Sequence, residues 1–195
     1  MPGSPTIYFI RHGETDWNRD RRYQGQRDVP LNDTGRAQAR RNGQALRALL
    51  PAIAEAEFIA SPLGRARQTM EIVRTELELP PRDYAFEPRL MELCYGVWEG
   101  TLQDDIARDD PDNFAARARD PYRWRPEQGE SYADLFARVS GWAETVGRDC
   151  VVVSHGGVSR CLRARLLHLA PESIPLLESP QDRILILSAG TMRWL

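Results

Sequence analysis

The sequence has no lysine, so all 26 of its basic residues are arginines. A Walker A phosphate loop needs a lysine beside the phosphates, and a Schiff-base enzyme needs a lysine amine, so both classes are excluded. The 28 acidic residues bring the formal net charge to −2, which gives no overall attraction to nucleic acid. We therefore expect no nucleic-acid partner.

Cysteine is also scarce. The chain has three cysteines: Cys94, Cys150 and Cys161. Their odd number and the lack of a CxxC pair argue against a disulfide framework and fit a reducing compartment. A cysteine phosphatase needs an arginine six residues after its cysteine, and none of the three has one. The zinc motif HExxH is absent as well, and we expect neither a metal ion nor another cofactor.

Long apolar runs are missing. None approaches the ~20 residues that cross a membrane. The first residues, MPGSPT, lack the charged start, apolar stretch and cleavage site of a secretory signal. We expect a cytoplasmic protein without a membrane partner. With 42% hydrophobic and 28% charged residues, the chain has a globular composition and suits one domain over residues 1–195.

Apolar runs that predict strands alternate with helical patterns. Strands are predicted over residues 6–10, 58–60, 84–86, 150–153, 184–187 and 191–195. Helices are predicted over about 34–50, with Leu50 on the apolar face, and, after Pro62, Ser131 and Gly157, over about 63–77, 132–146 and 158–168. This alternation predicts an α/β fold, a three-layer α/β/α sandwich with a mostly parallel central sheet. Residues 100–129, which are polar and only weakly patterned, predict a small helical cap insertion.

Two of the three histidines follow a predicted strand directly and precede a glycine. They are His12 in Arg-His-Gly and His155 in Ser-His-Gly-Gly. Ligands of such sheets collect beyond the carboxyl ends of the strands, and glycine lets the backbone turn and a ligand approach. We therefore expect the two imidazoles at one edge of the sheet. His168 lies among leucines late in a predicted helix, and we expect it to be structural.

Arginines accompany these histidines. Arg11 adjoins His12, and Arg65 lies just inside the helix that follows a predicted strand, where helix N-terminal amides could also meet an anion. Guanidinium groups bind phosphate through paired, charge-assisted hydrogen bonds, and histidine can act as a nucleophile. Arg67 is expected on another face of the helix. The pattern predicts a site for a small-molecule phosphate ester.

These residues carry a resemblance to a known family. The segment RHGETDWNRDRRYQG, residues 11–25, is similar to the signature of the histidine phosphatase superfamily, also called phosphoglycerate mutase-like. Four further segments fit in the right order: SPLGRARQT (61–69), RLMELCYGVWEG (89–100), GESYADLFARV (129–139) and VVVSHGGVSR (151–160). The resemblance covers essentially the whole chain.

The resemblance implies a metal-independent phosphatase. His12 would attack phosphorus and become phosphohistidine, while Glu92 would protonate the leaving oxygen and later activate water. One ring nitrogen of His12 must then stay unprotonated, so we expect the other to donate to a carbonyl at or near Gly13. The implied contacts with the phosphoryl group and substrate are Arg11, Asn18, Gln24, Gly25, Arg65, His155 and Gly156.

Two alternatives stay open. Mutases of the superfamily usually carry a longer insertion and an Arg-His-Tyr-Gly run after the acid, whereas Leu-Cys-Tyr-Gly follows Glu92 here. That departure favours the phosphatase branch and a substrate such as a sugar phosphate, without excluding a cofactor-dependent mutase. A non-catalytic protein that binds phosphorylated ligands would need neither a nucleophile nor an acid. A homodimer is also left open.

The predicted insertion offers candidates for contacts with the rest of the substrate. Aromatic residues at or near it could form apolar walls: Trp98, Tyr122 and Trp124. Its arginines could bind a second anionic group: Arg117, Arg119, Arg123 and Arg125.

Overall fold

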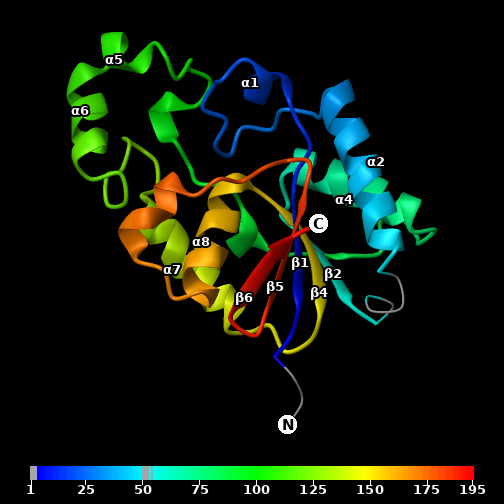
Figure 1. Cartoon of the computed structure of the whole chain (residues 1–195). Helices are drawn as coiled ribbons and strands as arrows, with labels where there is room; N and C mark the ends of the chain where they lie inside the picture. The colour runs from blue at the N-terminus through cyan, green and yellow to red at the C-terminus, as the bar shows by residue number, and fades with distance from the viewer. Residues whose placement is uncertain (1–3, 50–52, 54) are drawn as a thin grey trace.

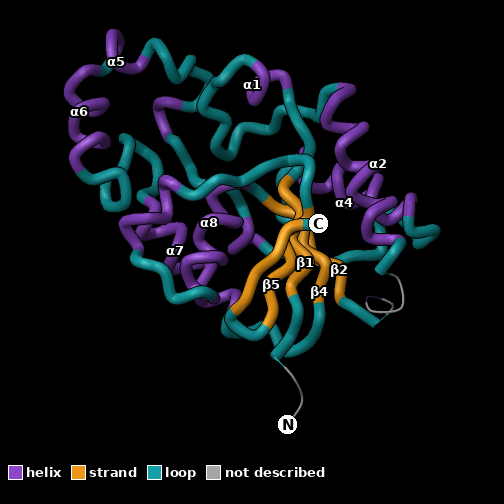
Figure 2. Tube along the Cα trace, in the orientation of Figure 1, coloured by secondary structure: helices purple, strands orange, loops and turns teal. Residues whose placement is uncertain are grey.

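The structure is a computed structural model that describes residues 4–49, 53 and 55–195. Its centre is a six-stranded sheet between two layers of helices (Figures 1 and 2). The strands are β1 (Ile7–Arg11), β2 (Glu57–Ala60), β3 (Ala85–Phe86), β4 (Cys150–Ser154), β5 (Ile184–Ser188) and β6 (Thr191–Trp194). They lie in the order β3-β2-β4-β1-β5-β6.

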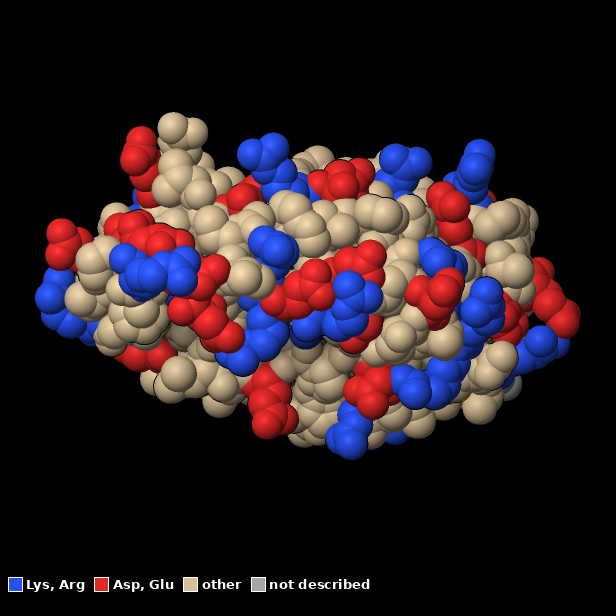
Figure 3. Space-filling view, turned by 90° about the horizontal axis from the view of Figure 1, so that it is seen from above, with Lys and Arg blue, Asp and Glu red and all other residues tan. Residues whose placement is uncertain are grey.

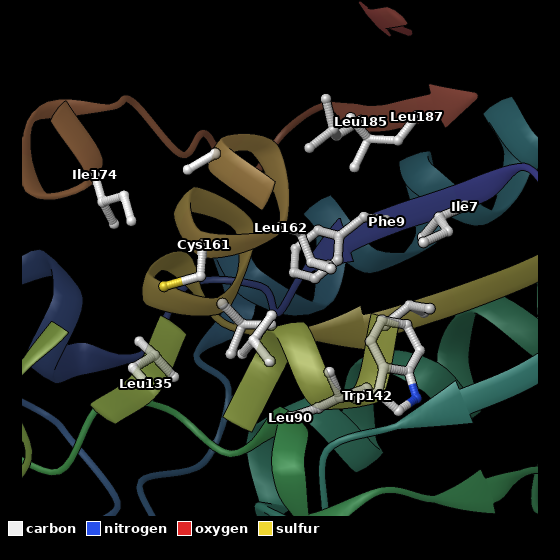
Figure 4. Close-up of a cluster of buried hydrophobic side chains, with 14 of the residues drawn as sticks. Ile7, Phe9, Leu90, Leu135, Trp142, Cys161, Leu162, Ile174, Leu185 and Leu187 are labelled. Carbon is white, nitrogen blue, oxygen red and sulfur yellow. The ribbon is translucent and has the colours of Figure 1, made fainter. Parts of the chain in front are cut away.

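The central strands are apolar throughout because both faces of the sheet are covered. Successive strand side chains point to opposite faces. In β1, Ile7 and Phe9 pack into one hydrophobic cluster, whereas Tyr8 and Ile10 pack into the other. The strands β4 and β5 divide their side chains between the two clusters in the same way. Figure 4 shows the first cluster, with Phe9 and Leu162 near its middle.

In the described part of the chain, four helices cover the sheet. They are α2 (Asp33–Arg47), α4 (Gly64–Glu76), α7 (Tyr132–Ala143) and α8 (Gly156–Leu166). The pair α2 and α4 packs on one face, and α7 and α8 pack on the other. Asn32 caps α2 by accepting the Gly35 amide at 2.9 Å, and Ser131 begins α7 in a capping box with Asp134. These layers confirm the predicted α/β/α sandwich.

The sheet is parallel from β3 through β2 and β4 to β1, and β5 runs antiparallel to β1. In the pairing of β1 with β4, Arg11 lies opposite Ser154. The residues that follow, His12 and His155, therefore leave the sheet side by side at the carboxyl edge. The structure places the two histidine motifs where the strand pattern predicted them.

Short elements complete the fold. They are α1 (Asp16–Arg19), α5 (Ile106–Asp109), α6 (Pro111–Arg119) and the 3₁₀ turns η1 (Pro88–Leu90), η2 (Gly96–Trp98) and η3 (Pro171–Leu176). Helices α5 and α6 lie away from the sheet, on the side of α1 (Figure 1). There Ile106 packs with Tyr23 and Trp98 in a small third cluster.

Three predicted helix ends differ from the structure. Helix α2 ends at Arg47, and Leu50 lies outside the described residues. Helix α7 ends at Ala143, and α8 ends at Leu166, so that exposed His168 lies beyond it with a positive φ of 54°. Helix ends fray and depend on tertiary contacts that a periodic pattern does not contain. Among the described residues no helix is both long enough and apolar enough to cross a membrane.

Candidate active site

A cavity of about 150 Å³ lies at the carboxyl edge of the sheet. Polar and charged side chains make up most of its lining. The lining residues are Arg11, His12, Asn18, Arg22, Tyr23, Gln24, Gly25, Arg65, Glu92, Tyr95, Gln103, Gly156 and Arg160. Of the nine site residues expected from the sequence, eight line this cavity, and His155 lies directly behind it.

The imidazole of His12 has a fixed tautomer. Its side chain is 2% exposed, and Nδ1 lies 2.7 Å from the carbonyl oxygen of Gly13. A carbonyl can only accept, so Nδ1 carries the proton and Nε2 keeps its lone pair. This confirms the predicted acceptor at Gly13. The lone pair of Nε2 accepts a hydrogen bond from Nε of Arg65 at 3.2 Å.

The guanidinium of Arg65 is fully buried yet has no carboxylate partner among the described residues. Besides the bond to His12, its Nη1 donates to the Arg27 carbonyl at 2.8 Å and its Nη2 to the Gly25 carbonyl at 2.6 Å. Burial lowers the pKa of Arg65 to about 10, because the charged form loses its hydration. Three neutral acceptors thus hold a cation that has no carboxylate within ion-pair distance among the described residues.

Burial and positive neighbours keep both site histidines neutral. The pKa of His12 lies well below its usual value, first because of burial and then because of Arg65 and Arg11. Burial, Arg65 and the other imidazole lower the pKa of His155 in the same way. The two rings are 5.1 Å apart between centroids. At neutral pH the site therefore presents a bare imidazole nitrogen among cations.

His155 is anchored from behind. It is fully buried, and its Nε2 lies 2.7 Å from Oγ of Ser61, the residue that follows β2. Its Nδ1 has no hydrogen-bond partner among the described residues. Ser61 was not identified from the sequence, although its position after β2 matches those of the two histidine motifs.

Three buried nitrogens at this site have no hydrogen-bond partner in the described part of the chain. They are Nε of Arg11, Nδ1 of His155 and Nε2 of Gln24. Arg11 is held by a bond from Nη1 to the Ser179 carbonyl at 2.5 Å, and Gln24 accepts from Thr15 through its Oε1 at 3.0 Å. Buried polar groups are nearly always paired, so these nitrogens indicate an anionic ligand with several acceptor oxygens.

Asn18 belongs to a network that the sequence did not reveal. Its Nδ2 donates to Oε1 of Gln24 at 3.2 Å, while its Oδ1 accepts from Nε2 of Gln181 at 3.1 Å. The same Gln181 nitrogen lies 3.1 Å from the backbone oxygen of His12. Gln181 comes from a loop more than 160 residues later in the chain, and no local motif marks it.

Glu92 is a half-buried carboxylate on the same cavity. Its Oε1 accepts the backbone N–H of Leu93 at 2.9 Å and that of Gly157 at 3.1 Å. A methyl group at Gly157 would collide with this oxygen, which explains the second glycine of the Ser-His-Gly-Gly motif. The acid is therefore fixed at the start of α8, beside the anchored His155.

The walls of the cavity differ from the expectation. Tyr23 and Tyr95 line it, with ring centroids 4.7 Å apart. Trp98 and Trp124 instead stack on each other behind that wall, and Tyr122 lies in the main hydrophobic cluster. Only Gln103 comes to the lining from the segment 100–129.

The arginines expected to bind a second anion do not line the cavity. Arg123 is near Asp120 and Glu172, and Arg125 forms an ion pair with Asp134 at 2.7 Å. Arg119 is exposed on α6, and Arg117 bonds the hydroxyl of Tyr23 from behind. Nearby carboxylates thus already pair with two of the four, and a second anion at these arginines stays a prediction.

One backbone N–H at the start of the helix that carries Arg65 already has a partner. The amide of Gly64, the first residue of α4, donates to the carboxylate of Asp28 at 2.9 Å. That N–H is therefore not free for a ligand. Arg67 is exposed and lies over the Phe86 ring, which confirms that it faces away from the site.

The charge balance of the cavity favours an anion. Four arginines line it with a single carboxylate, that of Glu92, and none of the four forms an ion pair among the described residues. In the described part of the chain, no three His, Cys, Asp or Glu side chains gather as a metal site would require. The site can bind a phosphoryl group and present Nε2 of His12 to it.

Comparisons with known proteins agree on one family. The pattern of the histidine phosphatase superfamily, branch 1, matches residues 7–194. A protein of Cronobacter sakazakii named "Probable phosphoglycerate mutase GpmB" is 33% identical over 168 residues, 84% of this chain and 75% of its own. The adenosylcobalamin/alpha-ribazole phosphatase of Escherichia coli K12 is 31% identical over 173 residues, 86% of this chain and 82% of its own.

Solved structures are similar over almost the whole chain. The alpha-ribazole phosphatase of Shigella flexneri has a TM-score of 0.80 and 29% identity, covering 93% of this chain and 89% of its own. A mycobacterial glucosyl-3-phosphoglycerate phosphatase, solved with VO3, has a TM-score of 0.78 and 30% identity, covering 98% of this chain and 96% of its own.

Replacing Arg65 by glutamine should abolish anion binding at this site. Tungstate, a tetrahedral oxyanion, should raise the melting temperature of the wild-type chain, because ligand binding stabilises the folded state by mass action. Arg67→Gln is the matched control on the same helix and should keep the full shift. Thermal melts with increasing tungstate measure the shift in melting temperature of both variants. An equal shift in the two would contradict the role of Arg65 in anion binding.

Proposed function

The chain belongs to branch 1 of the histidine phosphatase superfamily, and on that premise we propose that it hydrolyses small phosphate monoesters through a phosphohistidine on His12. The observation that carries the proposal is the buried, neutral imidazole whose bare Nε2 accepts a hydrogen bond from Arg65, a buried guanidinium held by neutral acceptors. A nucleophile held this way suits an incoming phosphoryl group, whose negative charge the guanidinium can offset.

In the first step Nε2 of His12 forms a bond to phosphorus while the bond from phosphorus to the leaving oxygen breaks. Arg11, Arg65 and Nδ1 of His155 offset the charge on the three equatorial oxygens. Glu92, protonated when the ester is bound, passes its proton to the leaving oxygen, so the alcohol departs neutral and Glu92 is left as a carboxylate. The hydrogen bond from Nδ1 of His12 to Gly13 stabilises the ring as it becomes positive.

In the second step a water molecule attacks phosphorus in line with the His12 nitrogen. Glu92, now a carboxylate, accepts a proton from that water, the P–N bond breaks, and inorganic phosphate leaves. Asn18, Gln24, Gly25 and Gly156 complete the lining around the transferring group. The arginines supply the charge that a metal ion would otherwise contribute, so we propose a metal-independent reaction.

The cavity favours a leaving group rich in hydroxyls. Its volume of about 150 Å³ accommodates the phosphoryl group, and polar side chains surround it except at the two tyrosines. A sugar phosphate or a similar small metabolite fits this description. Relatives named as phosphatases of alpha-ribazole phosphate and of glucosyl-3-phosphoglycerate support a phosphorylated sugar derivative.

The surface charge and the cysteines bear on the partners and the compartment of the proposed reaction. Arginines and acidic residues are interspersed over the face seen in Figure 3, which offers no continuous basic surface for nucleic acid. All three cysteines are free thiols, which fits the reducing cytoplasm.

A cofactor-dependent phosphoglycerate mutase is the second candidate, favoured by the name of the 33% identical relative from Cronobacter sakazakii. The Leu-Cys-Tyr-Gly run after Glu92 lacks the basic residues with which mutases hold a bisphosphate. Incubation of 3-phosphoglycerate with 2,3-bisphosphoglycerate separates the two: a mutase forms 2-phosphoglycerate, whereas a phosphatase releases inorganic phosphate.

Rapid quench in alkaline detergent of the enzyme mixed with a ³²P-labelled sugar phosphate should trap label on His12. The label should be stable to base and labile to acid, as expected of a P–N bond, and His12→Ala should retain none. A chelator should leave the rate of phosphate release unchanged. If the wild-type chain binds the ester but neither labels nor releases phosphate from a broad panel, it is a non-catalytic binder.

Glu92→Gln should slow hydrolysis in a way that depends on the leaving group. With an alkyl phosphate the loss in kcat should be about 10²–10⁴-fold, the usual contribution of a general acid. With p-nitrophenyl phosphate the loss should be much smaller, because p-nitrophenolate leaves without a proton. Glu87→Gln is the control, since Glu87 does not line the cavity. Equal losses with both substrates would remove Glu92 from the role of acid.

A further inference from the structure

Glu99 is a second carboxylate near the site, and the reaction described above does not use it. Its side chain is 8% exposed and does not line the cavity. Its Oε1 accepts two backbone N–H groups, that of Gln26 at 2.8 Å and that of Tyr95 at 3.1 Å. Its Oε2 lies 3.6 Å from Nε of Arg27. One carboxylate thus joins two loops that are far apart in the sequence.

The first of these loops, residues 24–27, holds Arg65. The carbonyls of Gly25 and Arg27 accept both terminal nitrogens of that guanidinium, at 2.6 and 2.8 Å. Gly25 has a positive φ of 52°, and a methyl group there would collide with the carboxylate of Glu99. The loop therefore packs directly on Glu99, and the position of its two carbonyls depends on that contact.

The second loop, residues 92–99, carries the acid. Glu99 binds the Tyr95 amide within it, and Nε2 of Gln26 crosses from the first loop to the Glu92 carbonyl at 3.0 Å. The two loops are thus linked twice, once through Glu99 and once through Gln26. Their mutual position sets how the acid Glu92 stands relative to Arg65.

We propose that Glu99 is a positioning residue for phosphoryl transfer, which orients the Arg65 guanidinium toward His12 by fixing the loop that carries its two carbonyl partners. The expected effect on rate rests on the proposed function. The expected effect on anion binding depends only on how Arg65 is placed. Without the carboxylate, two half-buried N–H groups lose their acceptor and the loop is free to shift. A misplacement of about 1 Å at a reacting group can cost 10²-fold in rate.

Three variants separate positioning from charge. Glu99→Ala removes both acceptor and charge, Glu99→Gln keeps the reach and one acceptor oxygen, and Glu99→Asp keeps the charge but shortens the reach. We expect Glu99→Ala to lose about 10²-fold in kcat, and Glu99→Gln to recover most of it. The loop is positioned by hydrogen bonds that need the full length of the side chain. The kcat of Glu99→Gln should therefore be higher than that of Glu99→Asp. The reverse order would show that Glu99 acts only as a counter-charge and would overturn the proposal.

The pH profile gives a readout that a merely structural role would not move. The groups that face His12 are Arg11, Arg65, His155 and the Gly13 carbonyl. Arg65 lowers the pKa of His12, so a displaced guanidinium should let that pKa rise. The acid limb of kcat/KM should therefore move to higher pH in Glu99→Ala and return toward its original position in Glu99→Gln.

Glu87→Ala is the matched control. Glu87 also binds a backbone N–H, that of Arg89 at 2.9 Å, and pairs with the same arginine at 2.7 Å, but it has no contact with either loop. It should leave the acid limb and kcat unchanged even where it lowers the melting temperature. A Glu99→Ala enzyme that is less stable but keeps its kcat and acid limb would overturn the proposal.

Binding of an oxyanion tests the position of Arg65 without any turnover. Calorimetric titration of each folded variant with tungstate measures how well Arg65 is placed for an oxyanion. Glu99→Ala should bind tungstate at least tenfold more weakly than the wild type, with Glu99→Gln close to the wild type. If Glu99→Ala does not fold, the order of Glu99→Gln and Glu99→Asp decides the matter. Wild-type affinity in all variants overturns the proposal, whereas tungstate binding without hydrolysis in the wild type defeats only the proposed function.

Discussion

The site depends on one contact, the hydrogen bond from Nε of the buried Arg65 to Nε2 of His12. It is stable only if the imidazole stays neutral, because a second cation at this distance would be strongly repelled in a buried setting. The carbonyl of Gly13 fixes the proton on Nδ1 and so directs the lone pair at the guanidinium. Before substrate binds, the His12 nucleophile is therefore already oriented and the Arg65 cation is already desolvated. Both features favour the binding of a phosphoryl group.

The rest of the fold holds this pair in place. Parallel pairing of β1 with β4 puts His12 beside His155, and the end of β2 supplies Ser61 behind them. Loop carbonyls, in place of carboxylates, hold Arg65 and Arg11. Neutral acceptors orient a guanidinium without cancelling its charge, which leaves that charge available for the substrate. The hydrophobic layers on both faces of the sheet make these strand ends rigid.

Much of this could be predicted from the sequence, and the remainder has a common physical cause. Strand–His–Gly motifs are local, so the pattern placed His12 and His155 at one edge of the sheet, and the family resemblance pointed to Glu92. Gln181 and Glu99 escaped notice because their partners are distant in the chain and no periodicity marks them. Of the arginines after α6, Arg125 pairs with Asp134 and Arg123 lies near Glu172, and these carboxylates come next to them only on folding.

The most direct test of the central claim is the protonation state of the His12 ring in the resting protein. Nitrogen-15 NMR of the imidazole distinguishes a bare nitrogen from a protonated one. We expect a neutral ring with the proton on Nδ1 and a bare Nε2 at pH 7 and still at pH 6, below the ordinary histidine pKa of about 6.5. A doubly protonated ring at pH 6, or a proton on Nε2, would contradict it.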